Sequence, residues 1–403
     1  AFRSMAIGIM LSVIFVLAAS LTLLPAVLGR IGPKVNSLSL PWVRQGEHRS
    51  ARFAAWGERL WKRPLLYGIP AFLVLVGLAL PILNLDTGMP SIKVVPSSDQ
   101  SRQGYEQLAG AFGPGAPGTV QVVTSGELSA DTTAVLESDP GIARVVPAVE
   151  SGGGEVLIQA IPDDDPSTNE MAATIERLRS DLPAQSLLGG ASVENFDLEN
   201  ALAGKTALVI GVVLALGFLL LLIALRAPVV AALGVLTNLL AAGAAFGVAK
   251  LIFQDGMLSG LLGFESQGFL DAWAPVFFFA MIFAISMDYS VFLLSSAKEH
   301  WEKSGDPKEA LIGGMAHSGR VIFAAAGVMV AVFFTFALSG PLPPKEMGII
   351  LGVAVLLDAA LVRLLLLPVL IRLAGRSAWW LPAWADRILP NVDVEGDKLN
   401  QVL

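Results

Sequence analysis

Cysteine is absent from the 403 residues, which excludes disulfides, thiolate chemistry and cysteine-ligated metal sites. Histidine is scarce: His48, His300 and His317 lack the spacing of metal ligands, so we expect neither a metal ion nor another cofactor. No patch interleaves basic with aromatic residues, which argues against a nucleic-acid partner. Charged residues make up 15% of the chain and hydrophobic residues 54%, against roughly 25% and 45–50% in soluble domains. Much of this chain therefore belongs in lipid.

The hydrophobic residues are gathered in runs long enough to cross a membrane. A hydrocarbon core about 30 Å thick needs about 20 helical residues, and the mean hydropathy is +0.66. Membrane helices are predicted near residues 6–29, 65–85, 206–226, 229–252, 274–297, 321–339 and 347–371. The first run is too long, and lacks the small-residue cleavage site, for a cleavable signal peptide. These runs predict an α-helical polytopic membrane protein.

Charges between the runs predict which segments lie inside. Segment 30–64 carries only Glu47 and Glu58 against many basic residues, namely Arg30, Lys34, Arg44, Arg49, Arg52, Arg59, Lys62 and Arg63. By the positive-inside rule this segment is cytoplasmic. The resulting plan is a membrane helix at 1–29, a cytoplasmic linker at 30–64, a membrane helix at 65–85, an extracytoplasmic domain at 86–205, three membrane helices in 206–297, a cytoplasmic loop at 298–320, two membrane helices in 321–371 and a cytoplasmic tail at 372–403. In the loop, Asp306 and Pro307 predict the start of an amphipathic helix along the inner surface.

Segment 86–205 is predicted to fold as a compact α+β domain. A helix near 100–112 is followed by the strand "TVQVVTS", the helix "DTTAVLES" and the strands "IARVVPAVE" and "EVLIQAIP", joined by the hairpin "SGGG". A helix in "DPSTNEMAATIERLRSDL" and a last strand in "SLLGGASV" complete the order βαββαβ between residues 119 and 193. This is the ferredoxin-like order.

A short repeat links the two ends of the chain. "LLPAVLGRIG" at 23–32 is similar to "LLPVLIRLAG" at 366–375, with Pro25 matching Pro368. Transporters are often built from such repeated halves, and this period predicts about 280 further residues before Ala1. We therefore expect the chain to be the second half of a longer protein, with residues 1–29 forming the last membrane helix of the first half.

An acidic residue beside a phenol interrupts the run at 274–297. Asp288 and Tyr289 lie in "ISMDYSVFLLSS", well inside a predicted membrane helix. An ionised carboxylate there costs at least about 2.5–3.5 kcal/mol, so it must be paired, solvated or protonated. Desolvation raises the pKa of a carboxyl group toward neutrality, which suits it to binding and releasing protons. Asp288 is therefore a proton-relay candidate, and the alternative is a structural hydrogen bond between helices.

The last run adds two further ionisable residues. "LLDAALVRLLLLP" contains Asp358 and Arg363, and Arg363 is expected at the depth of Asp288. Asp358 and Arg363 are five positions apart, so in an α-helix their side chains should point apart rather than form an i,i+4 pair. We expect Arg363 to compete with a proton for an acid on a neighbouring helix. The alternative for Arg363 is snorkelling to the interface.

Several blocks together resemble one transporter family. "SMDYSVFLLSS", "HSGRVIFAAAGVMVAVF", "LLDAALVRLLLLP" and "WWLPAWADRILP" are similar to the second half of transporters of the mycobacterial membrane protein large (MMPL) family, within the resistance-nodulation-division superfamily. "PSSDQSRQGYEQLAGAFGPG" fits the same family, and the resemblance covers essentially the whole chain.

The resemblance implies a function and site residues. It implies a plasma-membrane protein, not an enzyme, with a porter-type extracytoplasmic domain, which exports lipids or lipid conjugates by proton antiport. Asp288 and Tyr289 match the aspartate-tyrosine pair of the second half, and Asp358 and Arg363 match the charged positions of the final helix. The expected partners are protons, a lipid or other hydrophobic substrate, membrane lipids and the first half of the same transporter.

Two other classes of protein could place aspartates in a membrane. An intramembrane aspartyl protease activates water between two carboxyl groups, but such proteases use YD and GxGD sequences, whereas this chain has "DY" and "LLDAA". A sterol-sensing-like or scaffold membrane protein would need no transport at all. It should tolerate Asp288→Asn, whereas a proton-driven pump should not.

Overall fold

The computed structural model describes residues 2–32, 34 and 49–390. The chain divides into two units, Ala1–His48 and Arg49–Leu403. In the first unit the predicted run forms one helix, α1 (Phe2–Ile31), with Pro25 near its end. Part of the predicted cytoplasmic linker, at 33 and 35–48, and part of the predicted tail, at 391–403, lie outside the described residues.

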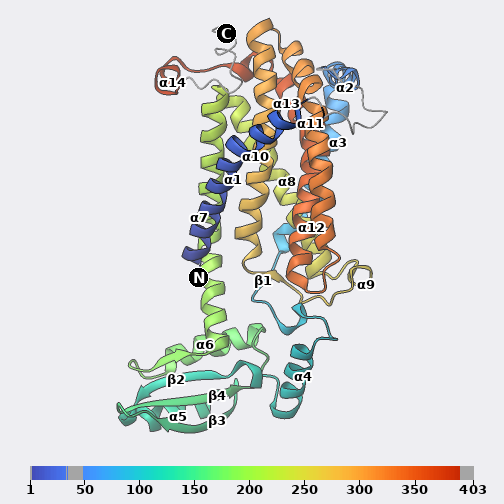
Figure 1. Ribbon diagram of the computed structural model, residues 1–403. Helices are drawn as coiled ribbons and strands as arrows, with labels where there is room; N and C mark the ends of the chain where they lie inside the picture. Colours follow the sequence, from blue (N-terminus) through green and yellow to red (C-terminus); the bar gives the residue numbers. More distant parts are fainter. Residues whose placement is uncertain (1, 33, 35–48, 391–403) are drawn as a thin grey trace. The chain divides into compact units, whose positions relative to one another are not determined.

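The second unit contains a bundle of long apolar helices (Figure 1). Together with α1, the described residues include 7 helices long and apolar enough to cross a membrane, in agreement with the predicted runs. The bundle consists of α3 (Pro64–Ala79), α7 (Ala191–Leu225), α8 (Pro228–Ala249), α10 (Ala274–Ser304), α11 (Pro307–Phe336) and a last span made of α12 (Leu342–Leu357), the π-helix η7 (Asp358–Leu366) and α13 (Leu367–Ala374).

Glycines let the helices approach closely. A Cβ on Gly247 of α8 would lie 1.9 Å from the carbonyl oxygen of Leu78 on α3, and one on Gly217 of α7 would lie 2.2 Å from the ring of Phe283 on α10. Only glycine fits where two backbones or a backbone and a ring meet at these distances. Gly211, on the same helix as Gly217, has open space beside it.

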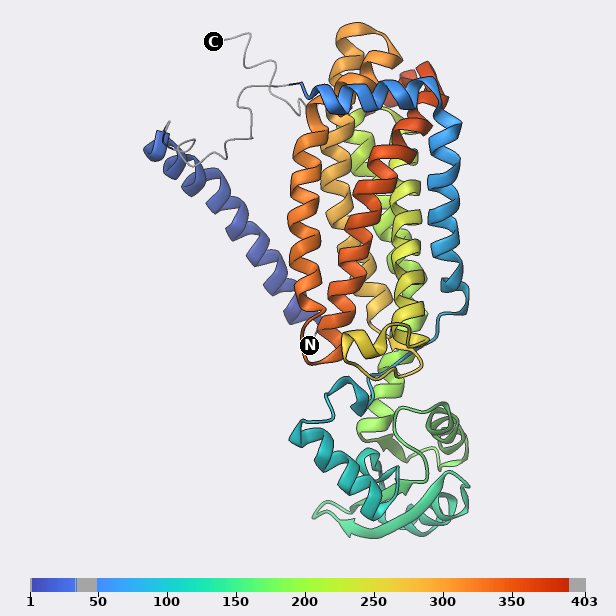
Figure 2. The same cartoon turned by 90° about the vertical axis from the view of Figure 1, so that its right-hand side faces the viewer.

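A short amphipathic helix crosses the end of the bundle that lies away from the α+β domain (Figure 2). This helix, α2 (Ala51–Lys62), buries Gly57 and Leu60 and leaves its basic residues exposed. The guanidinium of Arg372, on α13, lies 4.3 Å from the ring centroid of Trp61. Because α2 is too short to span a bilayer and has one apolar face, it lies along the bundle surface, which the linker prediction missed.

The predicted ferredoxin-like domain is confirmed. Its elements are α4 (Gln100–Phe112), β2 (Val120–Ser125), α5 (Ser129–Ser138), β3 (Ile142–Glu150), β4 (Glu155–Pro162), α6 (Asn169–Asp181) and β5 (Leu187–Gly189). The strands pair antiparallel in the order β3-β4-β2-β5. Along β2, Val120 and Val122 are buried and alternate with exposed residues, as one face of the sheet packs on α5 and α6.

Two predicted boundaries are wrong. The last strand ends at Gly189, and "ASV" begins α7, so the helix continues from the domain into the bundle without a break at 206. Segment 298–320 is not a separate amphipathic loop, because 298–304 completes α10 and 307–320 is the first half of α11. Asp306 does cap α11, accepting a hydrogen bond from the Lys308 amide at 2.9 Å, but residues 310–316 are buried in the bundle rather than laid on a membrane surface.

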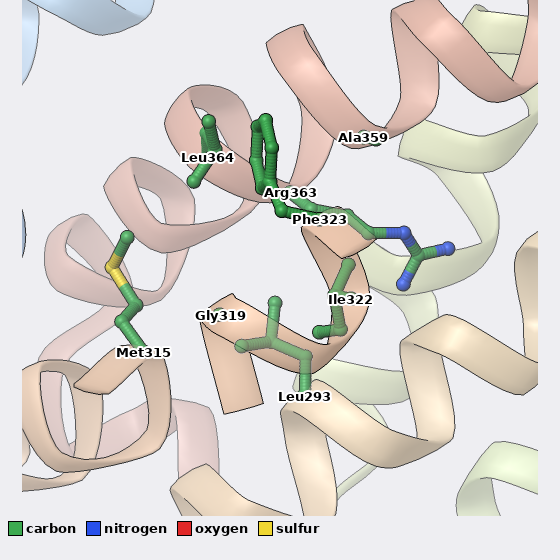
Figure 3. Close-up of a pocket in the computed structure, with 8 residues that line it drawn as sticks. All are labelled: Leu293, Met315, Gly319, Ile322, Phe323, Ala359, Arg363 and Leu364. Carbon is green, nitrogen blue, oxygen red and sulfur yellow. The ribbon is translucent and has the colours of Figure 1, made fainter. Parts of the chain in front are cut away.

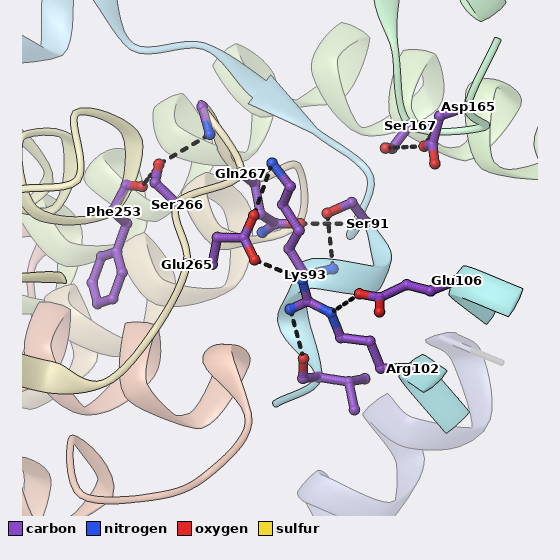
Figure 4. Close-up of polar contacts among 12 residues, drawn as sticks. Ser91, Lys93, Arg102, Glu106, Asp165, Ser167, Phe253, Glu265, Ser266 and Gln267 are labelled. Atoms are coloured by element: carbon purple, nitrogen blue, oxygen red, sulfur yellow. Dashed lines mark hydrogen bonds and ion pairs between the residues drawn. The ribbon is translucent and has the colours of Figure 1, made fainter. Parts of the chain in front are cut away.

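Irregular segments connect the domain to the bundle. Their short elements are η2 (Leu80–Asn84), β1 (Thr87–Gly88), η3 (Ile92–Val94), η6 (Lys250–Gln254), α9 (Ser259–Leu262) and β6 (Leu270–Asp271), and β1 pairs parallel with β6. Arg102 of α4 donates to Glu265 at 2.6 Å and to Glu106 at 2.8 Å (Figure 4). The bond from Arg102 lowers the pKa of Glu265, and Lys93 adds to the effect. This network fixes α4 against the segment that follows α9.

Candidate functional site

Asp358 and Arg363 form a buried ion pair within one helix. Arg363 Nε lies 2.8 Å and Nη2 2.7 Å from Asp358 Oδ2, and both side chains are almost fully buried. The prediction that these side chains point apart is wrong, because residues 358–366 form a π-helix. In a π-helix the hydrogen bonds run from i to i+5, so residues five apart lie one turn above each other.

Pro368 and Trp56 explain what supports this change in helix type. Proline has no N–H, so the carbonyl of Leu364 lacks the donor that residue i+4 would supply in an α-helix. The indole Nε1 of Trp56, on α2, donates to that carbonyl at 2.9 Å. The surface helix α2 thus satisfies the backbone of η7 next to the buried ion pair. Pro368 was the available sequence signal for the irregular turn, and the role of Trp56 was not predicted.

Arg363 also joins its helix to α10. Its Nη2 donates to the backbone carbonyl of Ser286, and its guanidinium carbon lies 5.5 Å from the centroid of the Tyr289 ring. The Tyr289 hydroxyl is 2.8 Å from the sulfur of Met329 on α11. Three of the four predicted relay residues, Tyr289, Asp358 and Arg363, are therefore brought together where α10, α11 and η7 meet.

Asp288 lies beside this group but faces the other way. Its side chain is exposed on α10, as are those of Met281, Ala284 and Phe292, which recur at helical spacing. No ion pair joins Asp288 to Arg363 among the described residues; the acid that Arg363 binds is Asp358 of its own helix rather than one on a neighbouring helix. The charge of Arg363 nevertheless acts on the Asp288 carboxylate.

The buried pair leaves polar atoms without partners. Asp358 Oδ1 and Arg363 Nη1 are buried and make no hydrogen bond. A buried charged group that lacks part of its hydrogen bonding is costly, and such groups mark functional sites more often than structural ones. The arrangement is therefore one that can change when a nearby charge changes.

The stem of Arg363 lines a small apolar pocket. Figure 3 shows its guanidinium extending away from Met315 and Leu364, which lie at the other side of the pocket. The pocket holds about 10 Å³, space for about one water molecule. It is too small to hold a lipid.

Asn238 joins two helices of the bundle beside the site. Its amide donates to the hydroxyl of Ser290 at 3.3 Å, joining α8 to α10 one residue beyond Tyr289. Such a side-chain hydrogen bond between membrane helices helps to hold them together.

Comparisons with known proteins agree with this architecture. The model of the MMPL family matches residues 98–391. The chain is 30% identical over 97% of its length to "Membrane protein YdfJ" of Bacillus subtilis, of which it covers 55%. It is 33% identical over 97% of its length to "Mycolic acid-containing lipids exporter MmpL11" of Mycolicibacterium smegmatis, of which it covers 43%. It is 34% identical over 98% of its length to "Heme uptake protein MmpL11" of Mycobacterium tuberculosis, of which it covers 43%.

The chain spans about half the length of these relatives. None of the three is named as an enzyme, and two are named for moving a compound. The family match covers the α+β domain, the site and the last span, and the helices place the protein across the plasma membrane several times. The resemblance of the sequence motifs is confirmed: this chain belongs to the MMPL family of the resistance-nodulation-division superfamily.

Proposed function

We propose that this chain forms the second half of a transporter that uses the proton motive force to export lipids, lipid conjugates or other hydrophobic compounds across the plasma membrane. Residues 86–205 are extracytoplasmic in this proposal. The observation that carries it is the buried pair of Asp358 and Arg363, with the half-buried Tyr289 against the guanidinium and Asp288 exposed beside them. The cargo class comes from relatives named for moving mycolic acid-containing lipids and haem, which are both hydrophobic.

The exposed position of Asp288 supports the part of the proposal in which this chain is one half of the transporter. Met281, Ala284, Asp288 and Phe292 form a stripe on α10 that no described helix of the second unit covers. A carboxylate facing lipid costs at least about 2.5–3.5 kcal/mol, so this stripe suits a protein surface rather than acyl chains. A first half of similar size, in line with the length of the relatives, would supply that surface.

Protonation of Asp288 can be coupled to helix movement through Arg363. Asp288 lies between Ser286 and Tyr289, the two residues of α10 that Arg363 contacts. Neutralising Asp288 removes a charge that acts on the guanidinium, and so changes the balance between its bonds to α10 and to Asp358. A proton that favours one of two packings of α10 against η7 shifts the population between them, and this movement would be passed to the domain through α7 and α12.

The test uses the full-length protein that contains this chain, reconstituted in vesicles with an imposed pH gradient. A fluorescent acyl lipid reports export and a trapped pH dye reports proton flux. We expect Asp288→Asn and Arg363→Ala to reduce both signals to the level of protein-free vesicles while membrane insertion is retained. The control is Asp386→Asn, which removes a surface ion pair with Arg226 and should leave both signals unchanged. Export by Asp288→Asn at the unmodified rate would reject the relay and favour a scaffold role.

A further inference from the structure

Two buried carboxyl groups outside the relay meet where the bundle joins the connecting segments. Asp271, in β6, and Glu346, in the second turn of α12, both have no solvent-exposed surface. They are close enough for the charge of Asp271 to act on the Glu346 carboxylate. Both oxygens of Glu346 and Oδ2 of Asp271 have no hydrogen-bond partner in the part of the chain that the structure describes.

No cation neutralises these two groups in the described ranges. The lysines in this region are bonded to other groups. Lys345 Nζ donates to the carbonyls of Leu262 and Gly263, Lys93 pairs with Glu265 at 3.3 Å, and Lys250 pairs with Asp255 at 2.7 Å. The acidic side chain of Asp86 accepts a hydrogen bond from the amide of Gln254 at 2.9 Å. The helices that pack on α12 contribute no ionisable side chain at this end, because residues 228–249, 274–287 and 321–336 contain none. Two carboxylates therefore share an apolar site without a counter-charge.

Such a pair cannot be doubly ionised at low cost. Like charges at short range disfavour each other, so one carboxyl group of the pair keeps its proton. Burial raises the pKa of Asp271 to about 6, although Gln267 and Trp273 favour its ionised form. A proton held between the two groups would also supply the donor that their unpartnered oxygens lack.

Gln267 connects the pair to solvent. Its amide nitrogen donates to Asp271 Oδ1 at 3.2 Å. Its oxygen accepts from the Ser91 amide at 2.7 Å (Figure 4). The same residue lines an open cleft of about 520 Å³, where Lys93, Asp165 and Glu170 also lie. Water in this cleft is thus one side chain away from the buried pair.

We propose that Asp271 and Glu346 form a proton-binding site at the domain end of the bundle, which holds one shared proton and exchanges it with water from the cleft that Gln267 lines. Uptake forms one O–H bond to a carboxyl group with a proton taken from water, and release returns it. Glu346 lies about 18 Å from Asp358 along the last span, at about 1.5 Å per residue. A role for this site in loading the relay from outside rests on the proposed function, whereas proton binding itself does not.

Infrared spectroscopy of the 403-residue chain in lipid nanodiscs tests proton binding directly. We expect a carboxyl carbonyl band at neutral pH, where ordinary carboxyl groups are ionised, and its shift in heavy water. Glu346→Gln should remove this band while folding is kept, because the glutamine amide has the same shape and donates to Asp271. The matched control Asp255→Asn, at an exposed carboxylate of the same connecting segment, should keep it.

Thermal unfolding gives a second readout. A folded-state pKa of about 6 lies above the ordinary value of 3.8, so the folded state retains a proton that the unfolded state loses. Stability should therefore fall as pH rises from about 4 to about 6, and this slope should flatten in Asp271→Asn/Glu346→Gln. A spectrum in which Glu346→Gln leaves every carboxyl band unchanged would overturn the proposal.

The two proposals fail separately. In one outcome the infrared band depends on Glu346, but export by the full-length protein does not change with the pH gradient. This result would support the proton-binding site and reject proton-driven export. Loss of export in Asp288→Asn without any Glu346 band would keep the relay and reject this site. Proton binding with an unchanged external pH dependence of export in Glu346→Gln would reject only its loading role.

Discussion

The ion pair of Asp358 and Arg363 is costly to bury, and its geometry only partly compensates for the lost hydration. Two ions removed from water each lose several kcal/mol of solvation, which the attraction between them repays when every remaining donor and acceptor is satisfied. Here Asp358 Oδ1 and Arg363 Nη1 are not satisfied. The pair is therefore better explained by a role in transport than by a contribution to stability.

A double-mutant cycle at this pair tests that explanation. Asp358→Asn and Arg363→Gln should each destabilise the bundle by about 3–5 kcal/mol, because each leaves one buried charge without its partner. The double variant should recover a large part of that loss, since two neutral amides remain. Unfolding in detergent micelles, followed by circular dichroism, measures the free energies. Losses that simply add would show that the two side chains do not depend on each other.

The identity of these residues could be predicted from the sequence, but their geometry could not. Asp288, Tyr289, Asp358 and Arg363 stand out because ionisable groups are rare in apolar runs. The contact between Asp358 and Arg363 depends on a π-helix, and an assumption of 3.6 residues per turn places them apart. Glu346 was missed because the predicted membrane run began at 347, one residue after it. Hydropathy therefore gave no reason to expect that its side chain is buried.

At the scale of whole elements, hydropathy located every bundle helix but misplaced helix ends. The prediction ended α10 at 297 and started the next span at 321, because polar residues such as Lys298, Glu302 and Lys308 interrupt the apolar pattern. Both helices continue through them, since their backbone groups remain paired and the intervening small residues pack inside. The close contact of Gly313 and Gly314 with His300 and Ala297 holds this extended hairpin together.

The contact between α3 and α8 gives a prediction with a control one turn away. Gly247→Ala would place a methyl group 1.9 Å from the Leu78 carbonyl oxygen, so the helices must separate at a cost of about 1–3 kcal/mol. Gly243→Ala meets only the Ala79 methyl at 3.6 Å, an ordinary contact, and should be neutral or slightly stabilising. Thermal unfolding of the two variants in the same detergent compares them. Equal midpoints would mean that α3 and α8 are not packed at this distance.

At the scale of the molecule, the division into a bundle and a ferredoxin-like domain follows from the sequence, because composition and strand periodicity change sharply at 86 and again near 206. The open stripe on α10 does not follow from it. A helix that faces lipid and a helix that faces protein have similar apolar sequences. Only the three-dimensional arrangement shows that the Asp288 side chain is exposed in the second unit.

The absence of cysteine allows this uncovered side to be probed with a single introduced thiol. Phe292→Cys, one turn beyond Asp288 and 42% exposed, should react with a lipid-soluble maleimide in the 403-residue chain alone. In the full-length protein it should be protected if the proposed first half covers the stripe. Labelling of each protein after unfolding in dodecyl sulfate sets the full extent of reaction.

The alternatives give different results in the same assay. Equal labelling of the two proteins would mean that the stripe faces lipid, so that Asp288 must be protonated or reach the interface without a partner helix. A disulfide between two copies of the 403-residue variant, together with protection, would instead show that a second copy can cover the stripe. Protection in the full-length protein alone would place the partner of Asp288 in the same chain, as a relay shared between two halves requires.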